Sequence, residues 1–414
     1  MDRPAAQMQD GAALPCVTAS EIPMLLLNTH PDHGQPLLPE DAETLGAAGA
    51  AAVEAQIRQR ENYAVTPLHE LPGLATQLGL GAIQVKDEGH RLGLGSFKAL
   101  GGSYVVVKLV LEEAARRLGR PVDIAELQSP AVREVAASLT FACATDGNHG
   151  RSVAQGAQLV GAKAAIFVHS GVSEERVAAI ARFGATMIRA EGTYDDSVAE
   201  AARVSAEKGW TVVSDTSWPG YERIPGLVMQ GYTALVAESL RQMKEPPTHV
   251  FVQVGVGGIA AAVAAHFALV LGETRPVFVA VDPARAACMV ASAQAGGPVK
   301  AEVGEPTVMA MLDCYEPSLV AWRILSRVAD AFMTVEDEDA VAVMNRLARP
   351  VGGDPVVVAG ESGGAGLAGL IRAAGDPAMR AQLKLGATSR VFVVNTEGAT
   401  DPARYAELVH GKAA

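Results

Sequence analysis

Charged and aromatic residues are scarce in this 414-residue sequence, at 19% and 5%, whereas hydrophobic residues make up 49%. This composition excludes a chain that is disordered over most of its length, because the apolar residues suffice for a large core. The length is enough for two or three domains or for one large enzyme fold. Basic residues are too few to balance the acidic ones, and the net charge of -12 argues against nucleic acid and anionic membranes as partners.

Cysteine is rare as well. Cys16, Cys143, Cys288 and Cys314 show no Cys-x-x-Cys spacing, which argues against a zinc site and against a disulfide framework. We therefore expect no bound metal and a cytoplasmic location. The polar start of the chain, Met1-Asp-Arg-Pro4, is not followed by an apolar segment, so we expect no secretory signal.

One long segment without charged residues runs from 250 to 272. The glycine turn Gly255-Val-Gly-Gly258 divides it before either part reaches the roughly 20 residues that a membrane-spanning helix needs. We interpret the segment as a buried strand, a turn and a buried helix.

One lysine is framed by glycines, in the stretch Gly93-Leu-Gly-Ser-Phe-Lys98-Ala-Leu-Gly-Gly102. Glycine lets the backbone bend and lets a flat ligand approach closely. A lysine in an apolar environment loses its proton more easily and becomes a nucleophile, as enzymes that form Schiff bases require. Because glycines beside a lysine are also common in loops, this stretch alone leaves a solvated lysine as an equal alternative.

Strands and helices alternate over much of the chain, which is typical of parallel sheets. Apolar spacing near 3.6 predicts a helix after Lys98, to about Leu118. Further helices are predicted over 41–60 and from Glu361 onward. The main strands are predicted at 82–85, 139–143, 164–168, 186–189, 211–213, 250–254, 277–281 and 391–394.

The turn Gly255-Val-Gly-Gly-Ile-Ala260 joins a predicted strand to a predicted helix. Its N–H groups and the helix N-terminus can hold a phosphate. The turn also fits the dinucleotide pattern G-x-G-x-x-A, with Asp282 at the end of the next strand. This motif alone favours a dinucleotide over a single phosphate, and a turn that merely packs a helix closely is the third interpretation.

A second glycine-rich turn, Thr145-Asp-Gly-Asn-His-Gly150, also joins a strand to a helix and can bind a carboxylate. A carboxylate at Asp146 is unexpected beside a bound anion unless it acts as a general acid or base. However, Asp and Asn are also ordinary turn and cap residues. We interpret His149 as structural. Asp215 ends a predicted strand, where sites gather in open α/β sheets, and the alternative is an N-cap of the segment 216–221.

Together these features resemble a known family. Ser96-Phe97-Lys98 with Gly101-Gly102 is similar to the Schiff-base lysine segment of fold-type II pyridoxal phosphate enzymes, the group of tryptophan synthase β and threonine dehydratase. Within that group the chain resembles the diaminopropionate ammonia-lyases, because dehydratases usually carry serine at the position of Asp146. The matching segments, over roughly residues 60–400, are Lys86-Asp-Glu88, Phe97–Tyr104, Ala144–Arg151, Asp215-Thr216 with Trp218, Gly220-Tyr221, Met229–Tyr232, Gly255–Gly257, Glu316-Pro317, Gly360–Gly363 and Asn395–Gly398.

Two places depart from the family's pattern. The family has Asn-Ala where this chain has Gly95-Ser96, and Asp where it has Ala399. Both places are expected near the cofactor, so the departures concern substrate preference more than the class of chemistry.

The resemblance implies pyridoxal 5'-phosphate as cofactor, held by Lys98 as a Schiff base and acting as an electron sink. A phosphate at the glycine turn displaces the dinucleotide interpretation. The implied cofactor contacts are Phe97, Asn148 at the ring hydroxyl, Gly255, Val256, Gly257 and Gly258 at the phosphate, and Thr396 at the pyridine nitrogen. The implied substrate contacts are Ser96, Thr145, Asp146 and Gly147.

The resemblance also implies the reaction. Lys98 would take the α-proton from one enantiomer of the substrate, Asp146 would take it from the other, and Asp215 would assist the departure of the β-amino group. We expect α,β-elimination of 2,3-diaminopropionate to pyruvate and ammonia, by a homodimer. A dehydratase of a hydroxy amino acid or O-substituted serine, an NAD-dependent oxidoreductase and a non-catalytic amino-acid sensor are the alternatives.

The expected architecture is an α/β fold with two lobes, each with a largely parallel sheet flanked by helices, and with the active site between them. The large lobe is assigned to residues 1–104 and 225–414, and the small inserted lobe to 105–224. Relatives can carry a cysteine pair near the positions of Cys288 and Cys314, so a disulfide between them is a minority hypothesis beside two thiols.

Overall fold

The computed structural model describes residues 14–17, 22–145, 147–192 and 194–411, and these residues form two compact units. Within the described ranges, unit 1 contains Ala52–Tyr63 and Lys98–Gly231. Unit 2 contains Leu14–Ala51, Ala64–Phe97 and Tyr232 onward. Within the described ranges, the chain passes between the units after Ala51, Tyr63, Phe97 and Gly231. The expected division into a large lobe of 1–104 and 225–414 and an inserted lobe of 105–224 remains a prediction.

Unit 1 is built on a parallel sheet with strand order β7-β6-β5-β8. Its strands are β5 (Thr140–Ala144), β6 (Lys163–His169), β7 (Thr186–Ala190) and β8 (Thr211–Val212). Its helical segments are α4 (Lys98–Leu118), η3 (Ile124–Glu126), α5 (Pro130–Ala137), α6 (Asn148–Val160), α7 (Glu174–Ala181) and α8 (Tyr194–Lys208).

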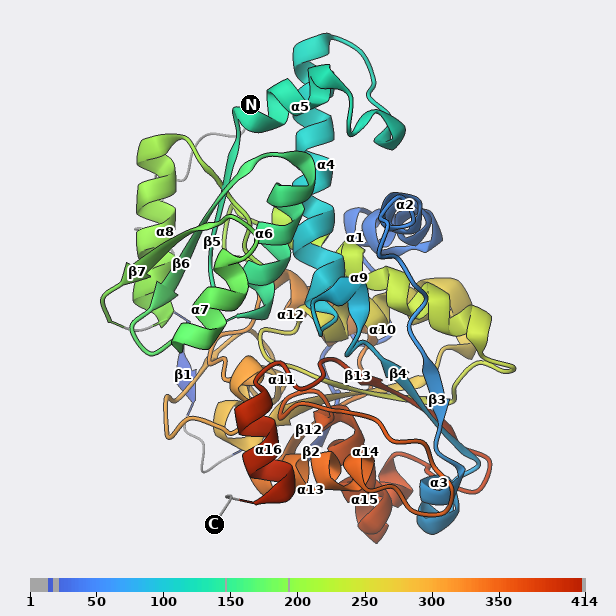
Figure 1. Ribbon diagram of the computed structural model, residues 1–414. Coiled ribbons are helices and arrows are strands. Elements are labelled where there is room, and N and C mark those ends of the chain that lie inside the picture. Colours follow the sequence, from blue (N-terminus) through green and yellow to red (C-terminus); the bar gives the residue numbers. More distant parts are fainter. Residues whose placement is uncertain (1–13, 18–21, 146, 193, 412–414) are drawn as a thin grey trace. The chain divides into compact units, whose positions relative to one another are not determined.

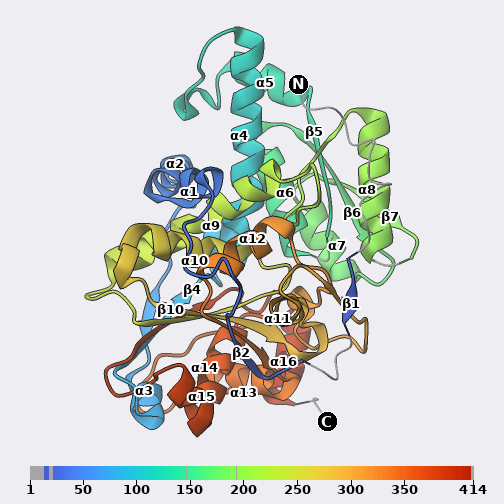
Figure 2. The same ribbon diagram turned by 180° about the vertical axis from the view of Figure 1, so that it is seen from behind.

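Right-handed crossovers explain how these helices cover the sheet of unit 1. The chain moves from β5 through β6 to β7 in one direction and then returns to β8, which places α6 and α7 on one face and α8 on the other. Helices α4 and α6 lie side by side (Figure 1), and α8 lies against β5 and β6, as the view from behind shows (Figure 2). The lysine helix α4 is therefore held by packing against α6.

Unit 2 is built on a larger sheet with strand order β2-β12-β10-β9-β13-β4-β3. The edge strands β2 (Leu25–Leu27) and β3 (Leu68–Glu70) are antiparallel to their neighbours. The parallel strands between them are β12 (Ala331–Val335), β10 (Val277–Pro283), β9 (His249–Gln253), β13 (Arg390–Asn395) and β4 (Ala82–Asp87). A separate short pair joins β1 (Cys16–Val17) to β11 (Lys300–Ala301).

Helices cover both faces of this sheet, and α14 packs directly on β9, β10 and β12. In Figure 1, α10 lies above the sheet and α13 and α14 lie below it. The helical segments are α1 (Pro39–Leu45), α3 (Pro72–Leu78), η2 (Arg91–Gly93), α10 (Gly258–Leu271), η4 (Gly272–Thr274), η5 (Ala284–Ala286), α11 (Cys288–Ala295), η6 (Ala310–Leu312), α12 (Leu319–Val328), α13 (Asp337–Ala348), α14 (Ala365–Gly375), α15 (Pro377–Gln382) and α16 (Pro402–His410). Helices α2 (Ala47–Ile57) and α9 (Arg223–Gln242) include residues of both units.

The α/β fold with largely parallel sheets is confirmed, as are α4 and the strand, turn and helix of residues 250–272. None of the helices in the described ranges combines the length and apolar character needed to cross a bilayer. Strand β12 was not predicted. It is buried along its whole length, and such a short apolar run carries no alternation that distinguishes it from a helix.

Two predicted helices are wrong in their bounds. The helix predicted over 41–60 is divided into α1 and α2 at Gly46, where a Cβ would lie 2.8 Å from the carbonyl oxygen of Ala42. Residues 361–364 form a turn, and α14 begins only at Ala365.

Candidate active site

The loop that leads to Lys98 is hydrogen-bonded to the segment that follows β13. The N–H of Phe97 donates to the carbonyl of Thr396 at 2.9 Å, and the N–H of Gly398 donates to the carbonyl of Gly95 at 3.0 Å. Gly95 has a φ of 79°, which favours glycine. These two hydrogen bonds fix the backbone at Gly95 and Phe97 against the segment that contains Thr396. Lys98 follows directly as the first residue of α4.

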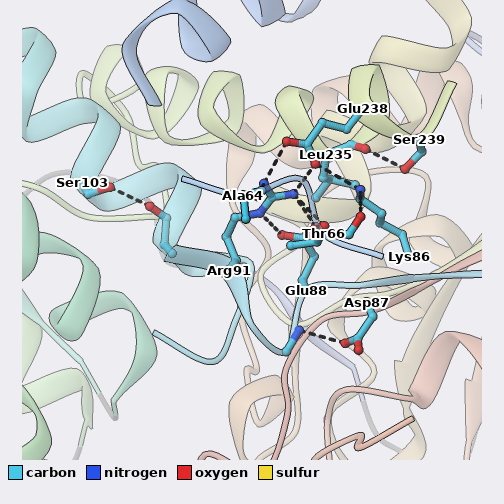
Figure 3. Close-up of polar contacts among 12 residues, drawn as sticks. Ala64, Thr66, Lys86, Asp87, Glu88, Arg91, Ser103, Leu235, Glu238 and Ser239 are labelled. Carbon is cyan, nitrogen blue, oxygen red and sulfur yellow. Dashed lines mark hydrogen bonds and ion pairs between the residues drawn. The ribbon is translucent and has the colours of Figure 1, made fainter. Parts of the chain in front are cut away.

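A buried cluster of charges holds the other end of this loop in unit 2 (Figure 3). Arg91 donates to Glu88 through Nε and Nη2, both at 2.7 Å, and to Glu238 through Nη1 at 2.9 Å and Nη2 at 2.6 Å. Lys86 donates to Glu238 at 3.0 Å and to the carbonyl of Thr66 at 2.8 Å. We call Thr66, Lys86, Glu88, Arg91 and Glu238 the Arg91 cluster.

The ions of the Arg91 cluster compensate one another, because two cations face two carboxylates and all four side chains are inaccessible to solvent. Burial opposes ionisation of Glu238, but the hydrogen bonds and charges of Arg91 and Lys86 keep its pKa below the ordinary value. Lys86 and Glu88 entered the sequence prediction only as part of a motif, and Arg91 and Glu238 were not predicted. Glu238 is the single acidic residue within the largely apolar sequence of α9, and this was the feature of the sequence that could have indicated it.

In unit 1, the ammonium of Lys98 forms an ion pair with Asp215. Burial opposes ionisation of Asp215, but the charge of Lys98 and the hydrogen bond that Lys98 donates lower its pKa below the ordinary value. The ring nitrogen Nε2 of His149 donates to the carbonyl of Val213 at 2.7 Å, and Nδ1 lies 3.9 Å from the Asp215 carboxylate. Burial lowers the pKa of His149, so the ring is neutral at pH 7. Lys98 and Asp215 together can accept and release a proton.

The second glycine-rich turn begins α6. The hydroxyl of Thr145 accepts hydrogen bonds from the N–H groups of Gly147 at 3.0 Å and Gly150 at 3.1 Å, so it caps the helix. Asn148, the first residue of α6, is buried. Asp146 lies outside the described residues. The roles assigned to this turn in substrate and cofactor binding remain predictions.

The Gly255 turn, between β9 and α10, has the properties of an anion site. Within the described part of the chain, the N–H groups of residues 255–260 have no hydrogen-bond acceptor. Gly257 has a φ of 101°, and a Cβ there would lie 2.4 Å from Cε of Met289 and 2.9 Å from Cβ of Ala321. Only glycine fits, and the N–H groups without an acceptor at a helix N-terminus suit a phosphate. The residues present therefore fit the phosphate of the implied cofactor.

Asp282, the acidic residue of the dinucleotide interpretation, is already engaged elsewhere. It is fully buried, its carboxylate accepts from the N–H of Val290 at 2.7 Å, and burial raises its pKa well above the ordinary value. A fully buried carboxyl that caps the start of α11 is poorly suited to bind a ribose.

Cys288 and Cys314 both lie against Gly255. The thiol of Cys288 is 3.5 Å from the carbonyl oxygen of Gly255, and a Cβ added to Gly255 would lie 3.1 Å from Sγ of Cys314. None of the four cysteines, all of which are described, forms a disulfide. The two residues are therefore present as thiols beside the turn, and the minority hypothesis of a disulfide between them is wrong for this structure.

Comparisons with known proteins identify the family of this chain. The sequence profile of the pyridoxal-phosphate dependent enzyme family matches residues 60–397. Diaminopropionate ammonia-lyase of Escherichia coli is 37% identical over 377 residues, which cover 89% of this chain and 93% of that protein. The enzyme of the same name from Salmonella typhimurium is 37% identical over 358 residues, covering 84% and 88%.

Solved structures lead to the same family. The holo diaminopropionate ammonia lyase from Escherichia coli matches with a TM-score of 0.83 at 34% identity, over 94% of this chain and 97% of that chain. The same enzyme has been solved in complex with an aminoacrylate-PLP azomethine reaction intermediate, with a TM-score of 0.83, 35% identity and the same coverage. These matches identify the cofactor as pyridoxal phosphate, whereas the placement of its phosphate at the Gly255 turn remains a prediction. The chain belongs to the diaminopropionate ammonia-lyase family of pyridoxal-phosphate dependent enzymes.

Proposed function

We propose that this protein converts 2,3-diaminopropionate and one water to pyruvate and two molecules of ammonia, by α,β-elimination followed by hydrolysis. The observation that carries the proposal is the ion pair of Lys98 with Asp215 at the start of α4. It pairs a carboxylate with the lysine of the segment by which the family is recognised, and this lysine is the residue that forms the Schiff base in the family. A sensor without catalysis has no need of this pair.

The cofactor, when bound, withdraws electrons from the α-carbon of the substrate. Lys98 would hold it through its amine, and the N–H groups of residues 255–258 would bind its phosphate. Thr396 would bond its pyridine nitrogen, Asn148 would bond its ring hydroxyl, and Phe97 would pack beside it. Support comes from the unpaired N–H groups of the turn and from the buried hydroxyl of Thr396.

Protons are moved by this chain's own side chains. The amine of Lys98 takes the α-proton of one enantiomer. Asp215 then assists the departure of the β-amino group, which leaves with a proton delivered by Lys98. Asp146 takes the α-proton of the other enantiomer from the opposite face.

Substrate binding is assigned to two loops. Thr145, Asp146 and Gly147 bind the substrate carboxylate, as the resemblance implies, and Ser96 adds a hydroxyl. Within the described residues, the buried Oγ of Ser96 has no hydrogen-bond partner, which supports its assignment to a bound ligand. A homodimeric state and a cytoplasmic location complete the proposal, and both follow from the resemblance and from cysteine usage.

The test is a stoichiometric assay on the purified protein with pyridoxal phosphate. Both enantiomers of 2,3-diaminopropionate, serine and threonine are offered, and keto acid and ammonia are measured in the same samples. We expect two ammonia per pyruvate from diaminopropionate and the highest kcat/KM for that substrate. Lys98→Ala should lose both the visible absorption of the bound cofactor and the activity. A variant that keeps both would refute the assignment of Lys98, and a preference for serine or threonine would favour the dehydratase alternative.

A further inference from the structure

The side-chain amide of Gln253, at the end of β9, is completely buried and has one orientation that its surroundings allow. Its Nε2 lies 2.6 Å from the carbonyl oxygen of Gly363 and 3.2 Å from those of Ser362 and Val394, and carbonyl oxygens only accept. Its Oε1 accepts from the N–H of Gly366 at 3.3 Å. If the amide were rotated by half a turn, its oxygen would face the carbonyl oxygen of Gly363, and its nitrogen would face the N–H of Gly366. Two acceptors would then meet at the first position and two donors at the second. Nε2 is therefore the end that faces Gly363.

This orientation determines how the hydroxyl of Thr396 can bond. Nε2 of Gln253 also lies 2.8 Å from Oγ1 of Thr396. An amide nitrogen carries two hydrogens, and the two shortest contacts, to Gly363 and Thr396, take them. Oγ1 of Thr396 is therefore an acceptor from Gln253, and its own hydrogen is left to be donated elsewhere.

The hydrogen of this hydroxyl is buried and needs a partner. Thr396 is only 3% exposed, and in the part of the chain that the structure describes no side chain or carbonyl accepts from its Oγ1. Buried donors in folded proteins are paired with rare exceptions. A ligand that accepts a hydrogen bond from Thr396 would satisfy this donor.

We propose that Gln253 sets the direction of the hydrogen bond between Thr396 and the pyridine nitrogen of the cofactor. The inference rests on the proposed function, in which Thr396 faces that nitrogen. A hydroxyl that already accepts from Gln253 donates to the ring, and a ring nitrogen that accepts this bond carries no proton. Gln253 does not touch the cofactor. It is a positioning residue that keeps the ring unprotonated through Thr396 and thereby sets how strongly the cofactor withdraws electrons.

The experiment uses holoenzyme loaded with pyridoxal phosphate labelled with ¹⁵N in the ring, and reads the protonation of the ring nitrogen by NMR across the pH range of the folded protein. The wild type and Thr396→Ser should show the unprotonated signal throughout. In Gln253→Glu, the carboxylate accepts the hydrogen of the Thr396 hydroxyl. A lone pair of the hydroxyl oxygen then faces the ring nitrogen, so the signal of the protonated nitrogen should appear at neutral pH. Gln253→Met removes the donor without adding charge, and should favour ring protonation by about tenfold, the effect of one ordinary hydrogen bond.

Two controls separate this effect from general damage to the fold. Gln84→Met removes another buried amide from the same sheet, one that bonds to Glu70, and should leave the ring nitrogen unchanged. In a Thr396→Val background, Gln253→Met should have no further effect on the ring nitrogen, because the proposed path runs through Thr396.

The outcomes distinguish the inference from the function on which it rests. A wild-type ring that is protonated at neutral pH, or a folded Gln253→Met holoenzyme with an unchanged ring signal, would overturn the role of Gln253. Gln253→Met alone decides the matter if the glutamate variant does not fold, since methionine conserves volume and brings no charge. Failure to bind pyridoxal phosphate, or to release ammonia from diaminopropionate, would instead count against the proposed function.

Discussion

The ammonium of Lys98 is paired with the carboxylate of Asp215, which lies 117 positions further along the chain. Nδ1 of His149 lies 3.9 Å from the same carboxylate oxygen, but that ring donates its hydrogen bond, through Nε2, to the carbonyl of Val213. Asp215 is therefore tied to Lys98 and not to a histidine base. Its lowered pKa keeps it ionised throughout the neutral range.

This pairing predicts a selective defect for Asp215→Asn. The variant keeps the shape of the side chain but removes the carboxylate that assists the departure of the β-amino group. We expect the release of ammonia and pyruvate to fall by roughly 10²–10⁴-fold, the usual contribution of a general acid or base. Exchange of the α-proton with solvent deuterium should fall much less. Equal losses in both measurements would mean that Asp215 supports proton removal and not the departure of the β-amino group.

His149 predicts a loss of stability in acid. Its pKa is lowered by burial, from 6.5 in the unfolded chain. Below about pH 6.5 the unfolded state binds a proton that the folded state does not, so the free energy of unfolding falls as the pH falls. The contribution of His149 is complete above that pH and decreases below it, by up to about 1.4 kcal/mol per pH unit. Unfolding by guanidinium chloride at pH 5.5, 6.5 and 7.5 measures it.

The variant His149→Gln should show a flatter acid limb than the wild type, since a glutamine amide can still donate to Val213 but does not titrate. His410→Gln, at an exposed position on α16, serves as the control and should reproduce the wild-type curve. The same acid dependence in the wild type and in His149→Gln would show that other groups cause it.

The Arg91 cluster predicts a large loss of stability. Arg91→Met leaves Glu88 and Glu238 buried, with only Lys86 to compensate them. Breaking a buried ion pair typically costs about 3–5 kcal/mol, and we expect a loss of that size in chemical unfolding. Arg116→Met breaks an exposed pair with Glu113 on α4 and should cost no more than about 1 kcal/mol. Equal and small losses would show that the cluster does not stabilise the lysine loop.

Gly257→Ala should weaken both the fold and the cofactor site. The added Cβ would meet Met289 and Ala321, at a φ of 101° that already disfavours alanine. We expect a loss of about 1–3 kcal/mol in stability and at least tenfold weaker binding of pyridoxal phosphate, measured by equilibrium dialysis. The matched control is Gly296→Ala, which has a φ of 70° but open space around it, and it should lose about 1 kcal/mol with cofactor binding unchanged.

Asp146→Asn tests the two-base mechanism. One base reaches one face of a planar group, so turnover of both enantiomers needs a base on each side. We expect the variant to lose activity toward D-diaminopropionate by roughly 10²–10⁴-fold and to lose far less toward the L-enantiomer. Initial rates with the separate enantiomers measure the ratio. An equal loss would place Asp146 in a shared step, and no loss would leave it as a turn residue.

The sequence by itself determined what depends on neighbours along the chain. The spacing of apolar residues after Lys98 predicts α4, and glycines mark the turn at Gly257 because its φ is open to glycine alone. The order of short motifs indicated the family and with it the cofactor. These features are local, since hydrogen bonds within a helix and the φ angle of a turn involve only a few consecutive residues.

The tertiary structure decided which distant groups meet. Lys98 pairs with Asp215 across 117 positions, Arg91 with Glu238 across 147, and Gln253 with Thr396 across 143. The spacing of apolar residues in the sequence does not indicate such pairs, because they depend on the order of strands in a sheet and on how helices pack against it. The direction of the hydrogen bond at Thr396 depends further on every acceptor around Gln253. A buried polar group takes the partners that the surrounding fold provides, and those partners are assembled only when the sheet is complete.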